Sequence, residues 1–140
     1  MVTQTVLEQA IVVATQCHAG QVDKAGIAYI LHPLAVMLEF PGDYTRQAIA
    51  VLHDVVEDTS MTLDSLRDLF PPEVVDGVDA LTRRPGETYK NFVRRSAQNE
   101  LAKPVKRADI VNNLLRLTPE LEGLKGRYAW ALGHLDGVLE

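Results

Sequence analysis

The chain has little of what marks several large classes of protein. Its 140 residues include one cysteine, Cys17, so an intramolecular disulfide framework is excluded and a reducing compartment is expected. No apolar stretch approaches the roughly 20 residues that span a bilayer, and the chain does not open on the pattern of a secretory signal. Lys and Arg number 14 against 19 acidic residues, so the positive footprint of a nucleic-acid-binding protein is missing. These absences predict a soluble, cytoplasmic protein that binds neither nucleic acid nor membrane.

Aromatic residues are also few. They make up 6% of the chain while hydrophobic residues make up 46%, so we expect an aliphatic core. Charged residues account for 24%, the ordinary share in a folded protein, which argues against disorder. The length is typical of one domain, and no repeat, low-complexity segment or linker divides the chain. Residues 1–140 are therefore expected to form a single domain.

Apolar residues recur at spacings of three and four along most of the chain, and no run alternates in the way of a confident strand. Helices are expected over 6–17, 33–40, 44–57, 63–70, 73–81, 88–99, 103–117 and 120–135. Polar stretches at 18–32 and 82–87 are expected to be loops. The pattern indicates an all-α, compact bundle of about seven to eight helices. The apolar side of the last helix would serve either the core or a homodimer contact.

One segment places acidic residues where a helix disfavours them. In 51–58, Glu57 follows His53 by four residues and Asp58 follows Asp54 by four, so a helix would gather a histidine and three carboxylates on one face. Like charges at this spacing repel, and the helix macrodipole disfavours anions at the C-terminal end. A shared cation would remove both conflicts. The other interpretation is a solvated acidic helix end with a partly buried histidine.

Two residues elsewhere favour the cation. His32 lies just before Pro33, which is expected to start a helix, and Asp109 lies in an otherwise aliphatic helix, where a carboxylate requires a partner. Together with His53 and Asp54 they would offer two imidazoles and two carboxylates. This mixed set suits a borderline or hard divalent ion and leaves positions open to water or substrate. It also accepts iron, cobalt, zinc or nickel, so the residue types alone leave the metal open.

The chain resembles the HD-domain phosphohydrolases, and among them the RelA/SpoT-type (p)ppGpp hydrolases and small alarmone hydrolases. Three blocks carry the resemblance in the right order. The first spans 14–34 and ends in YILHPL, the second is VLHDVVEDT at 51–59, and the third spans 105–113 and begins VKRAD. A bare His-Asp pair would carry no information, but three spaced blocks are specific.

The resemblance implies roles for individual residues. The metal ligands that it implies are His32, His53, Asp54 and Asp109, holding one divalent ion that is usually manganese. Glu57 and Asp58 would act on the attacking water, and Lys24 and Asn113 match positions that contact the nucleotide. The reaction implied is removal of the 3′-pyrophosphate from guanosine tetra- or pentaphosphate (ppGpp or pppGpp), which yields GDP or GTP and pyrophosphate.

One departure from the family pattern leaves the substrate open. The family has an Arg-Lys pair where this chain has Asp23-Lys24, and its arginine packs beside the guanine base. An aspartate beside a polyphosphate would repel it. The alternatives are therefore hydrolysis of another phosphorylated nucleotide, such as NADPH or a nucleoside phosphate, and a non-catalytic alarmone-binding module with a structural metal. Glu57 and Asp58 argue against the module, because metal binding alone does not require them.

Lys106 is a further candidate, because its charge would offset that of the leaving pyrophosphate. We favour the simpler expectation of a surface lysine that extends its amino group into solvent.

Overall fold

The computed structural model describes residues 2–140, and within this range the backbone is helical apart from turns and one isolated bridge between Val22 and Ala28. The prediction of an all-α fold is confirmed. In chain order the elements are α1 (Gln4–Cys17), α2 (Leu31–Met37), α3 (Tyr44–Leu52), α4 (Val55–Asp58), α5 (Leu63–Leu69), α6 (Pro72–Ala80), α7 (Tyr89–Ala97), α8 (Ala102–Leu115), the 3-10 helix η1 (Pro119–Leu124) and α9 (Lys125–Leu135).

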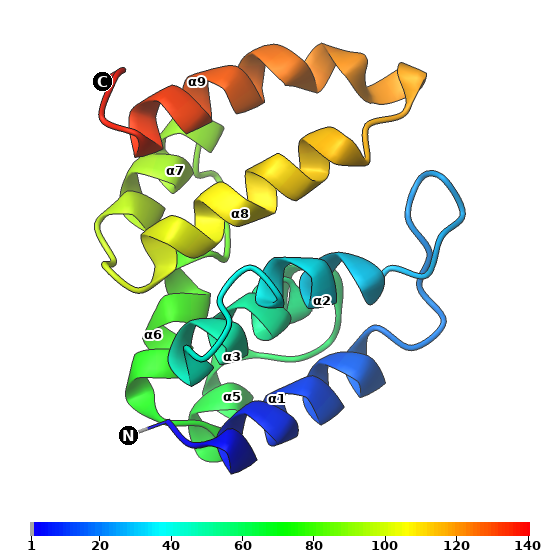
Figure 1. Ribbon diagram of the computed structural model, residues 1–140, viewed down its shortest axis with the longest axis vertical. Helices are drawn as coiled ribbons and strands as arrows, with labels where there is room; N and C mark the ends of the chain where they lie inside the picture. Colours follow the sequence, from blue (N-terminus) through cyan, green and yellow to red (C-terminus); the bar gives the residue numbers. More distant parts are fainter. Residues whose placement is uncertain (1) are drawn as a thin grey trace.

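The helices form two groups that meet along α8 (Figure 1). In the larger group α3 lies at the centre and packs against α1, α2 and α6, with every residue from 47 to 52 buried. The smaller group joins α7, α8 and α9 around a second cluster of buried residues. Because α8 also contacts α2 and α3, side chains on one of its faces reach the centre of the larger group.

Side-chain caps explain several helix starts. The hydroxyl oxygens of Thr3, Thr62 and Thr88 and the carboxylate of Asp43 each accept a backbone N–H in the first turn of the helix that follows. Such caps fix where α3 begins, and with it the position of the residues at its other end.

The helix predicted over 44–57 is divided, and His53 explains the break. Nδ1 of His53 lies 2.5 Å from the carbonyl oxygen of Ala50, which also accepts the backbone N–H of His53. In a continuing α-helix that carbonyl would accept the N–H of Asp54 instead. The chain therefore turns at His53 and Asp54 before α4 begins, so the prediction of one continuous acidic helix face was wrong.

Several other helix ends also differ from expectation. The second helix begins at Leu31, so His32 lies inside its first turn instead of ahead of it. The last predicted helix begins as the 3-10 segment η1 and becomes α-helical only at Lys125. Both of these segments border the candidate functional site.

The apolar side of α9 is largely used inside the molecule. Ala131 and Leu135 are buried in the second cluster, and Tyr128, Trp130 and Leu132 pack against it, whereas Val138 is exposed. Within residues 2–140, none of the helices combines the length and the apolar character needed to cross a bilayer.

Candidate metal centre

Four predicted residues converge from three parts of the fold. His32 comes from α2, His53 and Asp54 from the turn after α3, and Asp109 from the middle of α8. One ligand atom from each lies within 4.8 Å of the others. We call His32, His53, Asp54 and Asp109 the ligand cluster. His32, His53 and Asp109 are buried, and the side chain of Asp54 is 14% exposed.

The two histidines present the same ring nitrogen to the acids. Nε2 of His32 lies 2.9 Å from Oδ1 of Asp109, and Nε2 of His53 lies 3.1 Å from the same oxygen. Their Nδ1 atoms face the oxygens of Asn112, at 2.7 Å, and of Ala50. Because these oxygens only accept, Nδ1 carries the proton in each ring. In the neutral rings the Nε2 lone pairs therefore point at the carboxylates.

This arrangement fits a divalent cation. Lone pairs of imidazoles and carboxylates that face one another repel unless a cation lies between them. Four donors about 2.0–2.2 Å from one metal ion are separated from one another by about 2.9–3.5 Å. The separations of Nε2 of His53 from Oδ2 of Asp54 (3.1 Å) and of Nε2 of His32 from the same oxygen (3.7 Å) are close to this range. The donor set and its spacing thus suit one ion.

The charges of the ligand cluster are strongly interdependent. Burial alone would raise the pKa of Asp54, but the neighbouring His53 holds it at about 2. Burial likewise opposes ionisation of Asp109, yet Lys106 and His53 hold its pKa well below the usual range. Conversely, the charges of Asp54 and Asp109 outweigh the burial of His53 and raise its pKa well above normal. Both acids are therefore negatively charged, and without a metal the positive charge beside them comes from protonated His53 and from Lys106.

Two neighbours outside the cluster hold its acids in place. The hydroxyl of Tyr29 donates to Oδ2 of Asp54 at 2.5 Å. Nζ of Lys106 donates to Oδ2 of Asp109 at 3.0 Å and lies 4.5 Å from the ring centroid of Phe92. Lys106 is only 7% exposed, so the expectation of a surface lysine was wrong. It is buried beside its carboxylate partner, and no residue pattern in the sequence indicates that burial.

Glu57 and Asp58 lie at the rim. Both line a cavity of about 210 Å³ together with His32, Asp54 and Asp109. Partial burial and the charge of Asp54 raise the pKa of each carboxyl. Oε1 of Glu57 accepts the backbone N–H of Arg83, which ties it to the loop after α6. The amide of Gln21 donates to the carbonyl of Asp58, which joins α4 to the first loop.

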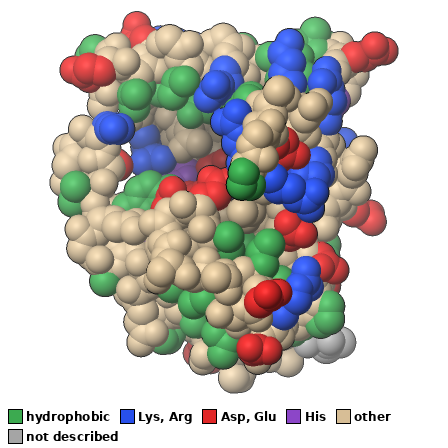
Figure 2. Space-filling view, turned by 180° about the vertical axis from the view of Figure 1, so that it is seen from behind, with side chains coloured by type: hydrophobic (Ala, Val, Ile, Leu, Met, Phe, Trp, Pro, Cys, Tyr) green, Lys and Arg blue, Asp and Glu red, His purple; other side chains and the backbone are tan. Residues whose placement is uncertain are grey.

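A second, larger space opens beside the ligand cluster. It measures about 590 Å³, and its lining includes Lys24 and Asn113 from the predicted site, together with Tyr29, Asp58 and Tyr128, which also line the smaller cavity. We call this space the outer cavity. Its size is within the range of sites that hold nucleotide-sized ligands, about 300–1,000 Å³. Figure 2 shows a deep hollow with acidic side chains along its edge and basic side chains and a histidine inside.

Sequence comparison decides the family. A profile of the HD domain matches residues 10–115, which is most of the chain and includes all four cluster residues. The chain belongs to the HD-domain family. The resemblance inferred from the three sequence blocks is thereby confirmed.

Named relatives indicate which HD domains are similar. The chain is 37% identical over 138 residues to a "Probable GTP pyrophosphokinase" of Mycobacterium leprae (strain TN), with 88% of this chain covered. It is 33% identical over 125 residues to the "Bifunctional (p)ppGpp synthase/hydrolase SpoT" of Escherichia coli (strain K12), with 79% covered. The chain spans 18% of the length of each of these two relatives.

A solved structure has the same fold. It carries the description "A metazoan ortholog of SpoT hydrolyzes ppGpp and plays a role in starvation responses". The two chains are 23% identical and superpose with a TM-score of 0.78, covering 99% of this chain and 90% of the other. The HD fold therefore extends across nearly the whole of this chain.

Some residues at the site escaped the sequence reasoning. Asn112 holds the ring of His32, and its place three residues after Asp109 on the same helix is the one signal that could have indicated it. Arg116, at the C-terminal end of α8, lines the outer cavity. Tyr29 was part of a motif block without a role of its own.

Proposed function

We propose that the chain hydrolyses the 3′-pyrophosphate of guanosine tetra- and pentaphosphate, with residues 1–140 acting as one hydrolase domain. The observation that carries the proposal is a buried set of two histidines and two aspartates that borders a cavity of nucleotide size. The relatives support the substrate, because several carry (p)ppGpp or GTP chemistry in their names.

The ligand cluster would hold the metal, and we propose Mn²⁺. A divalent ion there would supply a nucleophile near neutral pH by lowering the pKa of water, and would polarise a phosphoryl oxygen. His32 and His53 are oriented for this by Asn112 and Ala50, which keep the proton on Nδ1. Lys106 holds Asp109 by Oδ2, the oxygen that does not face the histidines, whereas Tyr29 donates to Oδ2 of Asp54, the oxygen that also faces Nε2 of His53.

Glu57 and Asp58 would manage the proton. In the reaction, the oxygen of water bonds to the phosphorus that is attached to the 3′ oxygen, and the bond from that phosphorus to the 3′ oxygen breaks. Glu57 accepts a proton from the water, and the 3′ oxygen takes up a proton from solvent as it leaves, becoming the hydroxyl of GDP or GTP. A carboxyl whose pKa is raised by partial burial is better matched to this exchange than a fully solvated one. Asp58, beside it, assists the same water.

The substrate would lie across the two cavities. The reacting pyrophosphate belongs beside the ligand cluster, where the buried ammonium of Lys106 offsets its charge. The nucleoside then extends into the outer cavity, where exposed Lys24 and the amide of Asn113 line the wall. In this placement, every site residue predicted from the sequence lies beside the substrate or the metal.

The direct test is incubation of Mn²⁺-loaded protein with ppGpp. We expect equal amounts of GDP and pyrophosphate, and no such products from the Asp54→Asn variant. Turnover of NADPH or a simple nucleoside phosphate with none of ppGpp would transfer the proposal to another nucleotide hydrolase. Tight ppGpp binding without any turnover by folded, metal-loaded protein would favour the non-catalytic module.

A further inference from the structure

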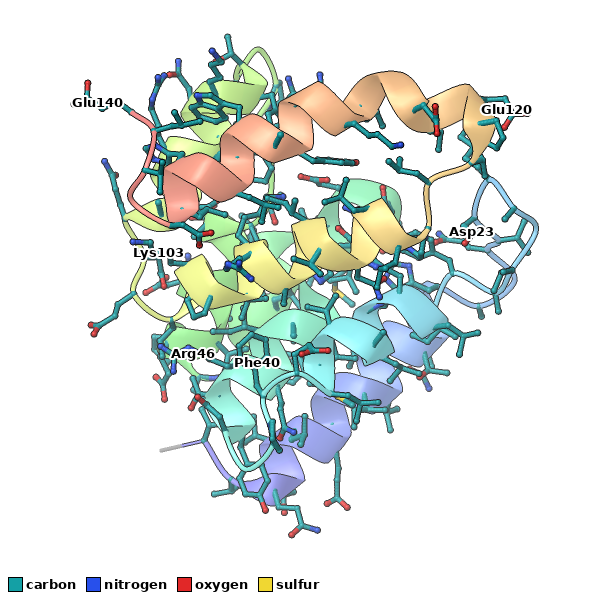
Figure 3. The ribbon with its side chains drawn as sticks, turned by 45° about the horizontal axis from the view of Figure 1, so that its top comes forward. Asp23, Phe40, Arg46, Lys103, Glu120 and Glu140 are labelled. Carbon is teal, nitrogen blue, oxygen red and sulfur yellow. The ribbon has the colours of Figure 1, made fainter. Side chains whose placement is uncertain are left out.

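The outer cavity contains a cation that the sequence pattern did not single out. Arg116 follows the last residue of α8 and lines the cavity together with residues of the 18–30 loop. Nη1 of Arg116 donates to Oδ2 of Asp23 at 3.3 Å, and Nη2 donates to Oδ1 of Asn113 at 2.6 Å. Figure 3 shows Asp23 on its loop beside this end of α8. The arginine is therefore held from two sides.

Asp23 is fully engaged by these contacts. Its Oδ1 accepts the backbone N–H groups of Ala25 and Ile27, at 2.9 and 3.0 Å, which shapes the tight turn of the loop. Its Oδ2 faces Arg116. The carboxylate expected to repel a polyphosphate is thus paired with a guanidinium. The negative charge at position 23 and the positive charge at position 116 cancel at the cavity wall.

Arg116 retains free donors. A guanidinium has five N–H groups, of which Asp23 and Asn113 each take one. Nε is buried and has no hydrogen-bond partner within residues 2–140. The guanidinium carbon lies 5.8 Å from the ring centroid of Tyr29, the residue that also holds Asp54 of the ligand cluster. The remaining lining includes apolar side chains, among them Val22, Leu117, Leu121 and Leu124.

We propose that Arg116, positioned by Asp23 and Asn113, selects a guanine base over an adenine base in the outer cavity. The inference rests on the proposed function, because it takes the outer cavity as the nucleoside site. The apolar side chains can pack against the faces of a flat base, and the fixed guanidinium can donate hydrogen bonds to one of its edges. Guanine presents two adjacent acceptors, O6 and N7, whereas adenine presents one acceptor beside an amino donor. Arginine therefore pairs with guanine and leaves the adenine amino group opposed to a donor.

The arrangement also explains why Asp23 is compatible with nucleotide binding. An arginine at position 23 would present its guanidinium from the first loop, whereas here the guanidinium comes from the end of α8, within hydrogen-bond distance of that loop. Asp23 acts as a positioning residue, and Arg116 makes the contact. The two positions form one unit, so changes at both should not add.

The test compares GDP and ADP, which have the same phosphates, by calorimetric titration of the Mn²⁺-loaded chain. Wild-type protein should bind GDP more tightly. Arg116→Lys keeps the charge but loses the planar fork, and should weaken GDP binding about tenfold while leaving ADP nearly unchanged. Asp23→Asn keeps an acceptor for the loop and should weaken GDP binding in the same direction. Combined with Arg116→Lys, it should add no further loss.

A matched control lies on the same helix. Arg107 of α8 pairs with Asp136 and lies outside the lining of the outer cavity, so Arg107→Lys should leave both affinities unchanged. Equal weakening of GDP and ADP by Arg116→Lys would assign the arginine to a phosphate and overturn the proposal, as would an unchanged preference for GDP. Binding needs no turnover, so a protein that prefers GDP through Arg116 but never hydrolyses ppGpp would refute the hydrolase alone.

Discussion

The ligand cluster and the outer cavity lie side by side but satisfy their charges in different ways. In the cluster, buried imidazoles and carboxylates are each held by a further group, such as Asn112, Lys106 or Tyr29. In the outer cavity one partly buried ion pair, Asp23 with Arg116, joins the first loop to the end of α8, and the arginine side chain is 27% exposed. A fully buried charge without its partner is costly, whereas a pair that is partly open to solvent contributes less to stability. Loss of a charged partner should therefore cost more stability in the cluster than in the outer cavity.

The largest loss of activity is expected when an acid of the ligand cluster is changed. Asp54→Asn removes a charge that both histidines face, and chelation of the metal should have the same result. We expect hydrolysis of ppGpp to fall at least about a thousandfold in each case, since a metal supplies several kcal/mol of transition-state stabilisation. Initial rates of pyrophosphate release measure this. Asp136→Asn, on the exposed pair with Arg107, is the matched control and should retain full activity.

Glu57→Gln separates proton transfer from metal binding. Glu57 lines the smaller cavity but is outside the ligand cluster. We expect kcat to fall by roughly 10²–10⁴-fold, the range for loss of a general base, while elemental analysis finds the same metal content as in wild-type protein. A variant that loses its metal along with its activity would show that Glu57 is a ligand, contrary to this assignment.

Lys106→Met tests the buried ion pair of Lys106 with Asp109, for comparison with the pair of Asp23 and Arg116 at the outer cavity. The change leaves the Asp109 carboxylate buried without its ammonium partner. In the presence of a chelator we expect the free energy of unfolding to fall by about 3–5 kcal/mol. Added Mn²⁺ should recover part of it, because the ion also neutralises Asp109. Asp23→Asn should leave the urea midpoint nearly unchanged, and a larger loss there than for Lys106→Met would reverse the comparison.

The smallest effect is expected at Lys24. Its exposed ammonium would act on the substrate phosphates through solvent, so Lys24→Ala should raise KM about fivefold at low salt, less at high salt, and leave kcat unchanged. Steady-state kinetics at two salt concentrations measure this. Lys103→Ala, at an exposed position outside both cavities, is the control. A drop in kcat would place Lys24 in the chemical step instead.

The difference between local and long-range contacts explains which features could be predicted from the sequence. Periodicity and breakers predicted the helical stretches, because each depends on neighbours three or four residues away. The break at His53 was missed because it depends on a ring nitrogen competing for one carbonyl, which no residue pattern records. Asp109 was found because a carboxylate in an aliphatic helix is anomalous in itself.

Contacts between residues far apart in the sequence could not be predicted. Lys106 looked like an ordinary surface lysine because its burial depends on Phe92 and Asp109 together. Asp23 looked repulsive because its partner, Arg116, lies 93 positions further along the chain. Roles for His32, His53, Asp54 and Asp109 were implied by the motif blocks, and the structure brings these four side chains together.

The most direct test of the account is anomalous diffraction from crystals of the chain grown with Mn²⁺. We predict one strong peak about 2.0–2.3 Å from Nε2 of His32, Nε2 of His53 and one oxygen each of Asp54 and Asp109. A peak held by other residues, or no peak at this position in crystals that contain the metal, would contradict it.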